Sequence, residues 1–231
     1  MANPIAITKA LAAASSTGIG TLSSASPGVA TLNTSNLDTQ RRIIIWSTGA
    51  TLASASFTIT GTREGGGTLG SETITGPTSN TVVTTTQDFL SVTSVSASSV
   101  IANTATIGTN NVGGTPWQSV NLTVTPIQLG GAITFSSSAN GMSAQIDLTM
   151  DNPFTFTPAS PGGLPLPLNQ PPIVFVSTLF STATSTNHAG AINAIGQALI
   201  TPIVAWRMTL TSSSTNAGVN AVVSVVQAGI G

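Results

Sequence analysis

The side chains that could act as nucleophiles, bases or metal ligands are few. The chain has one histidine, His188, and no cysteine. A serine nucleophile would therefore depend on a single imidazole, and no thiolate site can form. No Gly-x-Ser-x-Gly segment occurs, so the nucleophile elbow of the α/β hydrolases is missing. We interpret His188 as a loop residue with local hydrogen bonds, and a catalytic triad or a metal site remains the alternative.

Two carboxylates that lie close in sequence, Asp147 and Asp151, are the next candidates. On one strand their Cα atoms would lie about 13 Å apart, because each residue advances about 3.3 Å. That spacing is too wide for two ligands of one ion or for the carboxyl pair of a retaining glycosidase. We read Asp151 as the end of a strand, in an Asx-type turn before Pro153.

A glycine-rich segment, 63–67, is flanked by Glu64 and Glu72. We interpret it as a hairpin tip with both carboxylates solvated, and a bound cation is the alternative. A phosphate cradle would need a following Gly-Lys-Ser/Thr, which is absent. The sequence therefore predicts that the protein is not an enzyme and uses no cofactor or metal.

Charge is scarce throughout the 231 residues: 5 basic and 6 acidic side chains give a net charge of −1. Without clustered Lys and Arg, we expect no binding to nucleic acid or to anionic membranes. Arg41 and Arg42 should point to opposite faces of a strand, and one of them should pair with Asp38. The three tryptophans, at 46, 117 and 206, are spread widely, so we expect core anchors, with interface anchors as the alternative.

Serine and threonine make up 67 residues, about 29% of the chain. A surface of hydroxyls and amides lacks the charge repulsion that keeps free proteins apart. We infer that the chain lies against partner proteins.

Short runs of β-branched residues between turn signals predict an all-β fold, a β-sandwich with jelly-roll-like character and two lobes. The pattern predicts a hairpin from 203–211 and 219–226 and a short helix over 189–200. The remaining predicted strands are 41–47, 55–61, 71–75, 82–86, 89–97, 102–107, 117–124, 132–136, 142–150 and 173–180.

The predicted domains are an extended N-terminal arm at 1–30, a first lobe at 31–112 and a second lobe at 115–231. The break between the lobes falls in the Asn/Gly segment 110–114. A signal peptide is the alternative reading of the arm. No apolar run reaches the length of a membrane span.

A proline-rich loop, 158–172, interrupts the second lobe with six prolines. Because proline fixes φ, such a loop loses little conformational entropy when it docks. We expect this loop and the arm to reach partner proteins. The predicted contact residues are Pro161, Leu164, Leu166, Leu168 and Pro171.

Several strand and turn segments share one likeness, and they are 38–45, 57–62, 71–77, 88–95, 105–109, 116–117, 148–154 and 225–229. They resemble virion structural proteins of tailed bacteriophages, in particular head and tail proteins of short-tailed phages. The resemblance spans nearly the whole chain and departs from those proteins in segment 158–172 and in the very low charge.

The resemblance implies a non-catalytic, all-β component of a virion. The leading hypothesis is a capsid decoration (cement) protein on the capsid surface, which bridges major capsid subunits and contacts other copies of itself. A tail-associated adaptor or fibre-anchoring subunit, in contact with tail or portal proteins, is the first alternative. A carbohydrate-binding adhesin is the second, although the aromatic content of 4% disfavours sugar stacking.

Overall fold

The computed structural model has an all-β, sandwich-like fold: its described residues form strands and turns and no helix. It therefore contains, over those residues, no helix long and apolar enough to cross a membrane. The residues that the structure describes are 5–11, 14–23, 28–47, 49–63, 69–120, 125–135, 142–150, 153, 175–182, 190–192, 203–211 and 220–230.

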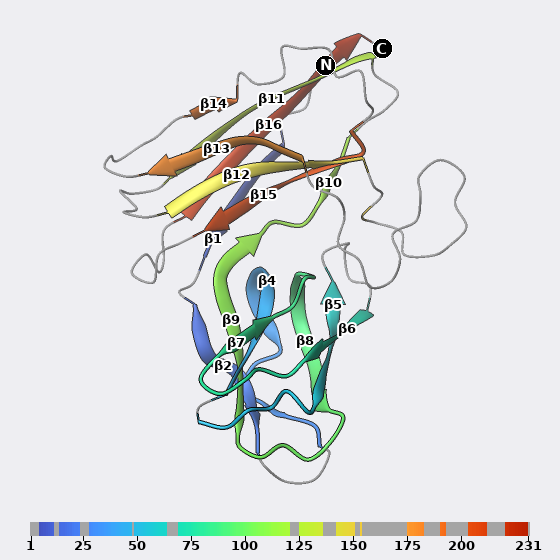
Figure 1. Ribbon diagram of the computed structural model, residues 1–231. Coiled ribbons are helices and arrows are strands. Elements are labelled where there is room, and N and C mark those ends of the chain that lie inside the picture. The colour runs from blue at the N-terminus through green and yellow to red at the C-terminus, as the bar shows by residue number, and fades with distance from the viewer. Residues whose placement is uncertain are drawn as a thin grey trace, which may run out of the picture. The chain divides into compact units, whose positions relative to one another are not determined.

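The chain divides into two compact units, which we name by their place in the sequence (Figure 1). The N-terminal unit covers Ala14–Val112. The C-terminal unit contains the described residues from Gly113 onward together with the first strand, β1 (Ile5–Ala10). Strand β9 (Ala105–Gly114) runs through the change of unit, so the predicted break at 110–114 is a strand and not a loop.

The N-terminal unit contains β2 to β8 and most of β9. The strand order runs β9–β4–β8–β5–β6, with β2 paired to β9 and β3, and β7 paired to β4. The bounds are β2 (Ser15–Leu22), β3 (Thr31–Leu32), β4 (Asn36–Ser47), β5 (Ser56–Arg63), β6 (Leu69–Thr75), β7 (Val82–Thr84) and β8 (Phe89–Ala97).

The core of the N-terminal unit follows from alternation along these strands. On β5, Phe57 and Ile59 are fully buried while the residues between them face outward, as a period of two requires. On β4, Ile43, Ile44 and Ile45 are all buried, so this part of the strand is covered on both faces. All of these side chains except Ile44 form one cluster with apolar residues of β2, β8 and β9.

Strands β5 and β6 form the predicted hairpin, in register from Ser56↔Thr75 to Thr62↔Leu69. Gly61 faces Gly70 across this pair. A Cβ on Gly61 would lie 1.9 Å from the backbone oxygen of Ser91 on β8, so no side chain fits at this close approach. Gly70 in turn leaves room for the buried side chain of Arg63.

The C-terminal unit contains two groups of paired strands. One has the order β1–β16–β11–β14, and in the other β12 lies between β13 and β15, with β10 also paired to β15. The bounds are β10 (Gln118–Ser119), β11 (Thr125–Phe135), β12 (Met142–Thr149), β13 (Phe175–Thr182), β14 (Gly190–Ile192), β15 (Ala205–Thr211) and β16 (Asn220–Ile230).

Three sequence-based expectations differ from this arrangement. The described parts of 1–30 are not an extended arm, because β1 pairs with β16 and β2 with β9, and Ile19 and Leu22 are buried. Strands β15 and β16 do not form a hairpin, because β15 pairs with β12 and β16 with β11. The start of the predicted helix is strand β14, and 193–200 lie outside the described residues.

Substitution of Gly61 by alanine should destabilise the N-terminal unit. The new methyl group would force β5 and β8 apart at the Ser91 oxygen, and such overpacking costs about 1–3 kcal/mol. Urea denaturation followed by circular dichroism measures the loss. Thr60→Ala is the control, because the Thr60 side chain points outward on the same strand; equal stability of the two variants would contradict the steric argument.

Candidate functional site

The residues predicted to contact partners lie outside the described part of the chain. This applies to Pro161, Leu164, Leu166, Leu168 and Pro171, and also to His188, Glu64 and Asp151. The structure does, however, place most of the charged side chains, and their positions decide what chemistry the described residues can perform.

Of the chain's 11 charged side chains, the structure describes eight, and six of these are buried. The two that reach the described surface are Asp38 and Arg42, and each lies in an ion pair. A chain poor in charge thus keeps most of its described charge inside. The six buried residues are Arg41, Arg63, Glu72, Asp88, Asp147 and Arg207.

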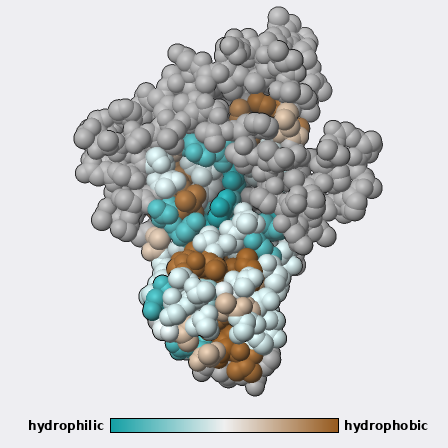
Figure 2. Space-filling view, viewed as in Figure 1, coloured by the Kyte–Doolittle hydropathy of each residue, from teal (hydrophilic) through white to brown (hydrophobic). Residues whose placement is uncertain are grey.

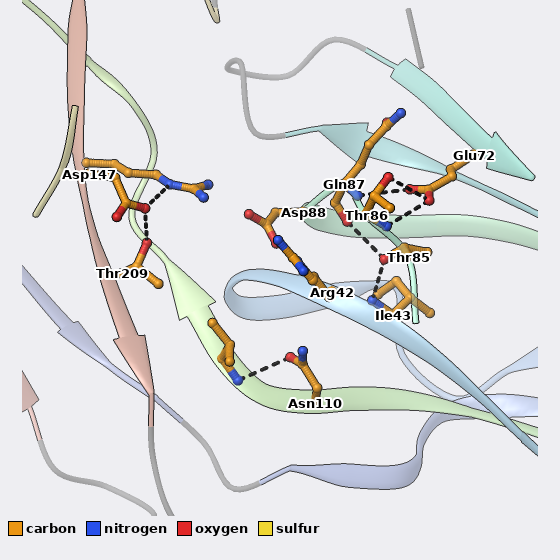
Figure 3. A network of polar contacts seen from close by, with 12 residues as sticks. Arg42, Ile43, Glu72, Thr85, Thr86, Gln87, Asp88, Asn110, Asp147 and Thr209 are labelled. Atoms are coloured by element: carbon orange, nitrogen blue, oxygen red, sulfur yellow. Dashed lines mark hydrogen bonds and ion pairs between the residues drawn. The ribbon is translucent and has the colours of Figure 1, made fainter. Parts of the chain in front are cut away.

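Arg41 and Arg42 occupy opposite faces of β4, as predicted. Arg41 is 2% exposed; its Nη1 lies 3.2 Å from Asp38 Oδ1, and its Nη2 donates to the backbone oxygen of Asn110 on β9 (Figure 3). The predicted pairing with Asp38 is confirmed. Arg42 points to the surface, with its Nε 3.6 Å from Asp88 Oδ1.

Glu72 is buried, which corrects the prediction that it is solvated beside the hairpin tip. Its Oε1 accepts hydrogen bonds from the backbone nitrogen (2.7 Å) and hydroxyl (2.9 Å) of Thr86, and its Oε2 accepts one from the backbone nitrogen of Gln87 (2.9 Å) (Figure 3). Because three donors face the carboxylate, burial leaves its negative charge compensated. Glu72 thereby fastens β6 to the segment between β7 and β8.

The same segment is tied to β4 by a second hydroxyl. The Oγ1 of Thr85 accepts from the backbone nitrogen of Ile43 at 2.9 Å and donates to the backbone oxygen of Gln87 at 2.9 Å. The side-chain amide of Gln87 is fully buried and makes no hydrogen bond within the described structure. Side chains therefore hold segment 85–88 at two places: Glu72 ties it to β6, and Thr85 ties it to β4.

In the C-terminal unit, strands are connected in a similar way by the buried ion pair of Asp147 and Arg207. Asp147 Oδ2 lies 3.1 Å from Arg207 Nε and accepts from the Thr209 hydroxyl at 2.6 Å (Figure 3). Its Oδ1 accepts from Gln145 Nε2 at 2.6 Å. The Arg207 guanidinium carbon stacks 4.8 Å from the centre of the Trp117 ring. The cluster joins β12 and β15 to the chain before β10.

The tryptophans partly follow the prediction of core anchors. Trp117 and Trp206 are buried, whereas Trp46 is half-buried. Trp117 owes its burial partly to the stacked guanidinium of Arg207, which the sequence spacing of 90 residues does not reveal.

The hydrogen bonds and ion pairs of these clusters hold strands of the protein together. Glu72 and Asp147 point their oxygens at donors of the protein itself. The described residues contain no group of three or more His, Cys, Asp or Glu side chains placed to hold a metal ion. Both clusters connect strands that are distant in sequence.

The outward face of the hairpin strands and β8 is a regular feature of the described surface. Every outward position on β5 is Ser or Thr, and the residues opposite them on β6 and β8 are Ser or Thr as well, except for Leu69, which faces Thr62. We name this the hydroxyl face; its residues are Ser56, Thr58, Thr60, Thr62, Ser71, Thr73, Thr75, Ser91, Ser94 and Ser96.

Hydrogen bonds run across the hydroxyl face from strand to strand. Thr58 Oγ1 lies 2.9 Å from Thr73 Oγ1, and Thr62 Oγ1 lies 2.6 Å from Ser91 Oγ. The described part of the surface in Figure 2 has wide pale areas, the colour of weakly polar residues such as Ser and Thr, together with teal hydrophilic and brown apolar patches. The hydroxyl face therefore presents neutral polar groups and no charge.

Comparison with known proteins gives little. No protein-family model matches the chain, and no curated protein matches it. Among solved structures, it is similar to a chain from "Structure of infectious bursal disease virus Gt strain", at 11% sequence identity and a TM-score of 0.23, over 100% of this chain and 78% of that one.

Replacement of Glu72 by alanine should lower the free energy of unfolding more than is usual for a residue on a terminal strand. Glu72→Ala leaves two backbone nitrogens and a hydroxyl without their acceptor, and we expect a loss of about 2–3 kcal/mol in the free energy of unfolding. Urea denaturation measures it. Ser71→Ala, at the adjacent exposed residue, should change stability by less than about 0.5 kcal/mol; a solvated Glu72 would make the two variants alike.

The Asp147–Arg207 pair should show strong coupling. Asp147→Leu or Arg207→Met alone leaves a buried charge without its partner, at a cost of about 3–5 kcal/mol, while the double variant should lose much less than the sum. A double-mutant cycle by urea denaturation provides the coupling energy. Additive losses would mean that the two charges do not compensate each other.

Proposed function

We propose that this chain is a non-enzymatic structural protein of a virion and that it acts as a capsid decoration protein. In this role it lies on the capsid surface and bridges major capsid subunits. The observation that supports the proposal most is the distribution of charge: the described surface carries Asp38 and Arg42, both ion-paired, and is otherwise neutral.

A neutral surface suits permanent contact with other proteins. Burying a hydroxyl that finds a partner costs little, whereas burying an unpaired charge costs several kcal/mol. The hydroxyl face can therefore be covered by a neighbouring subunit without leaving a buried charge unpaired. Many weak contacts of this kind, repeated over symmetric copies, would add up to firm attachment.

The resemblance of the strand segments to phage virion proteins supports the same class of function. It also supports a tail-associated adaptor or fibre-anchoring subunit as the second candidate. A carbohydrate-binding role finds less support, because the hydroxyl face offers no aromatic ring on which a sugar could stack.

Copy number tests the proposal and separates its two forms. Virus particles from cells that make this chain are purified, and the chain is quantified against the major capsid protein by gel densitometry. Hundreds of copies per particle support decoration, and a dozen or fewer indicate the tail. Absence of the chain from the particles would overturn both.

Attachment to the capsid should respond weakly to salt. With few charges on the described surface, screening has little to act on, so the affinity for capsids that lack the chain should change by less than about twofold between low and high ionic strength. Cosedimentation over a salt series measures it. A steep fall in binding with salt would show that charged contacts, and not neutral ones, hold the chain in place.

A further inference from the structure

Strand β6 ends the sheet order of the N-terminal unit. It pairs with β5 over seven residue pairs, and within the described part of the chain no strand pairs with its other side. A terminal strand presents backbone N–H and C=O groups at strand spacing. Another β-strand is the partner that satisfies such a row in register.

The features by which natural proteins protect such edges are largely missing from β6. Its sequence, LGSETIT, contains neither lysine nor proline, and its pairing with β5 shows no bulge. Ser71, Thr73 and Thr75 are exposed and uncharged. The one charge, Glu72, points inward and is compensated by donors of Thr86 and Gln87, so an added strand would not leave it unpaired.

We propose that β6 pairs antiparallel with β6 of a second copy of this chain, around a two-fold axis at Thr73. In this register Thr73 faces its own copy, Ser71 faces Thr75 and Glu72 faces Ile74. Hydroxyls thus meet hydroxyls, and no charge meets a like charge. This near-symmetry of the segment about Thr73 favours a second copy over an unrelated strand.

The opposite side of β6 already shows the contact that this pairing repeats. Thr73 there faces Thr58, and their hydroxyl oxygens lie 2.9 Å apart. Cross-strand Thr–Thr pairs of this kind stabilise antiparallel sheets. The pairing would also make the hydroxyl faces of the two copies continuous. The inference depends on the edge of β6 and not on the proposed place in a virion.

A single cysteine at the axis tests the pairing, because the chain has no other thiol. In the full-length Thr73→Cys variant the two Cα atoms would lie about 4.5–5.5 Å apart, within the range that a disulfide spans. We expect mild oxidation at low micromolar concentration to yield a covalent dimer, at least about tenfold faster than for the controls. Non-reducing gels measure the rate.

Two matched controls give the result its meaning. Thr93→Cys places an exposed thiol on β8, away from the edge. Ser71→Cys places it on β6 but about 13 Å from its copy in the proposed register. Cross-linking of Thr73→Cys no faster than either control would overturn the inference.

Charge variants test the same axis without a covalent bond. Thr73→Lys and Thr73→Asp should each sediment as monomers, because like charges would face each other, and an equimolar mixture should sediment as a dimer. Circular dichroism checks that both variants are folded. A monomeric unmodified chain in the same experiment would also overturn the pairing, whereas absence of the chain from virus particles would overturn only the proposed function.

Discussion

The constraint on which the described structure depends most is that a buried charge must be compensated by nearby polar or oppositely charged groups. An ionised side chain without them costs several kcal/mol in the protein interior. Asp147 satisfies the constraint with Arg207, Thr209 and Gln145, and Glu72 with the donors of Thr86 and Gln87. Each cluster can form only when its strands are in their final register, so each specifies the fold as well as stabilising it.

The burial of most described charges also determines the composition of the described surface. Because most described charges are buried, the described surface is left to hydroxyls, amides and scattered apolar residues. The hydroxyl face is a regular part of that surface, because the pairing of β5 with β6 and β8 places Ser and Thr residues opposite one another. A protein built in this way has little electrostatic repulsion between copies.

The strands of the N-terminal unit illustrate how much local pattern can predict. Strand β8 was predicted at its observed bounds, and the β5–β6 hairpin has its expected partners, because alternation and a glycine-rich turn are local signals. The predicted hairpin of 203–226 failed for the opposite reason. Strand β15 pairs with β12, about 60 residues earlier, and such long-range pairing leaves no local signal.

In the candidate site, too, some residue positions follow from local pattern and others depend on long-range contacts. That Arg41 and Arg42 face opposite ways on β4 follows from the strand period, so it could be predicted. That Glu72 is buried could not, because its neighbours Ser71 and Thr73 are polar and exposed and its partners lie 14 and 15 residues later in a segment without regular structure. Gly114 and Thr115 likewise gave no sign that they lie beside β15.

The sequence by itself determined the all-β class, the alternation that exposes hydroxyls, and the poverty of groups that could support catalysis, because these depend on composition and on period. The tertiary structure alone decided which charges are buried, which strands pair across long distances, and which strand lies at the edge. Those properties depend on contacts between residues far apart in the chain, and only the complete set of hydrogen bonds and ion pairs selects among them.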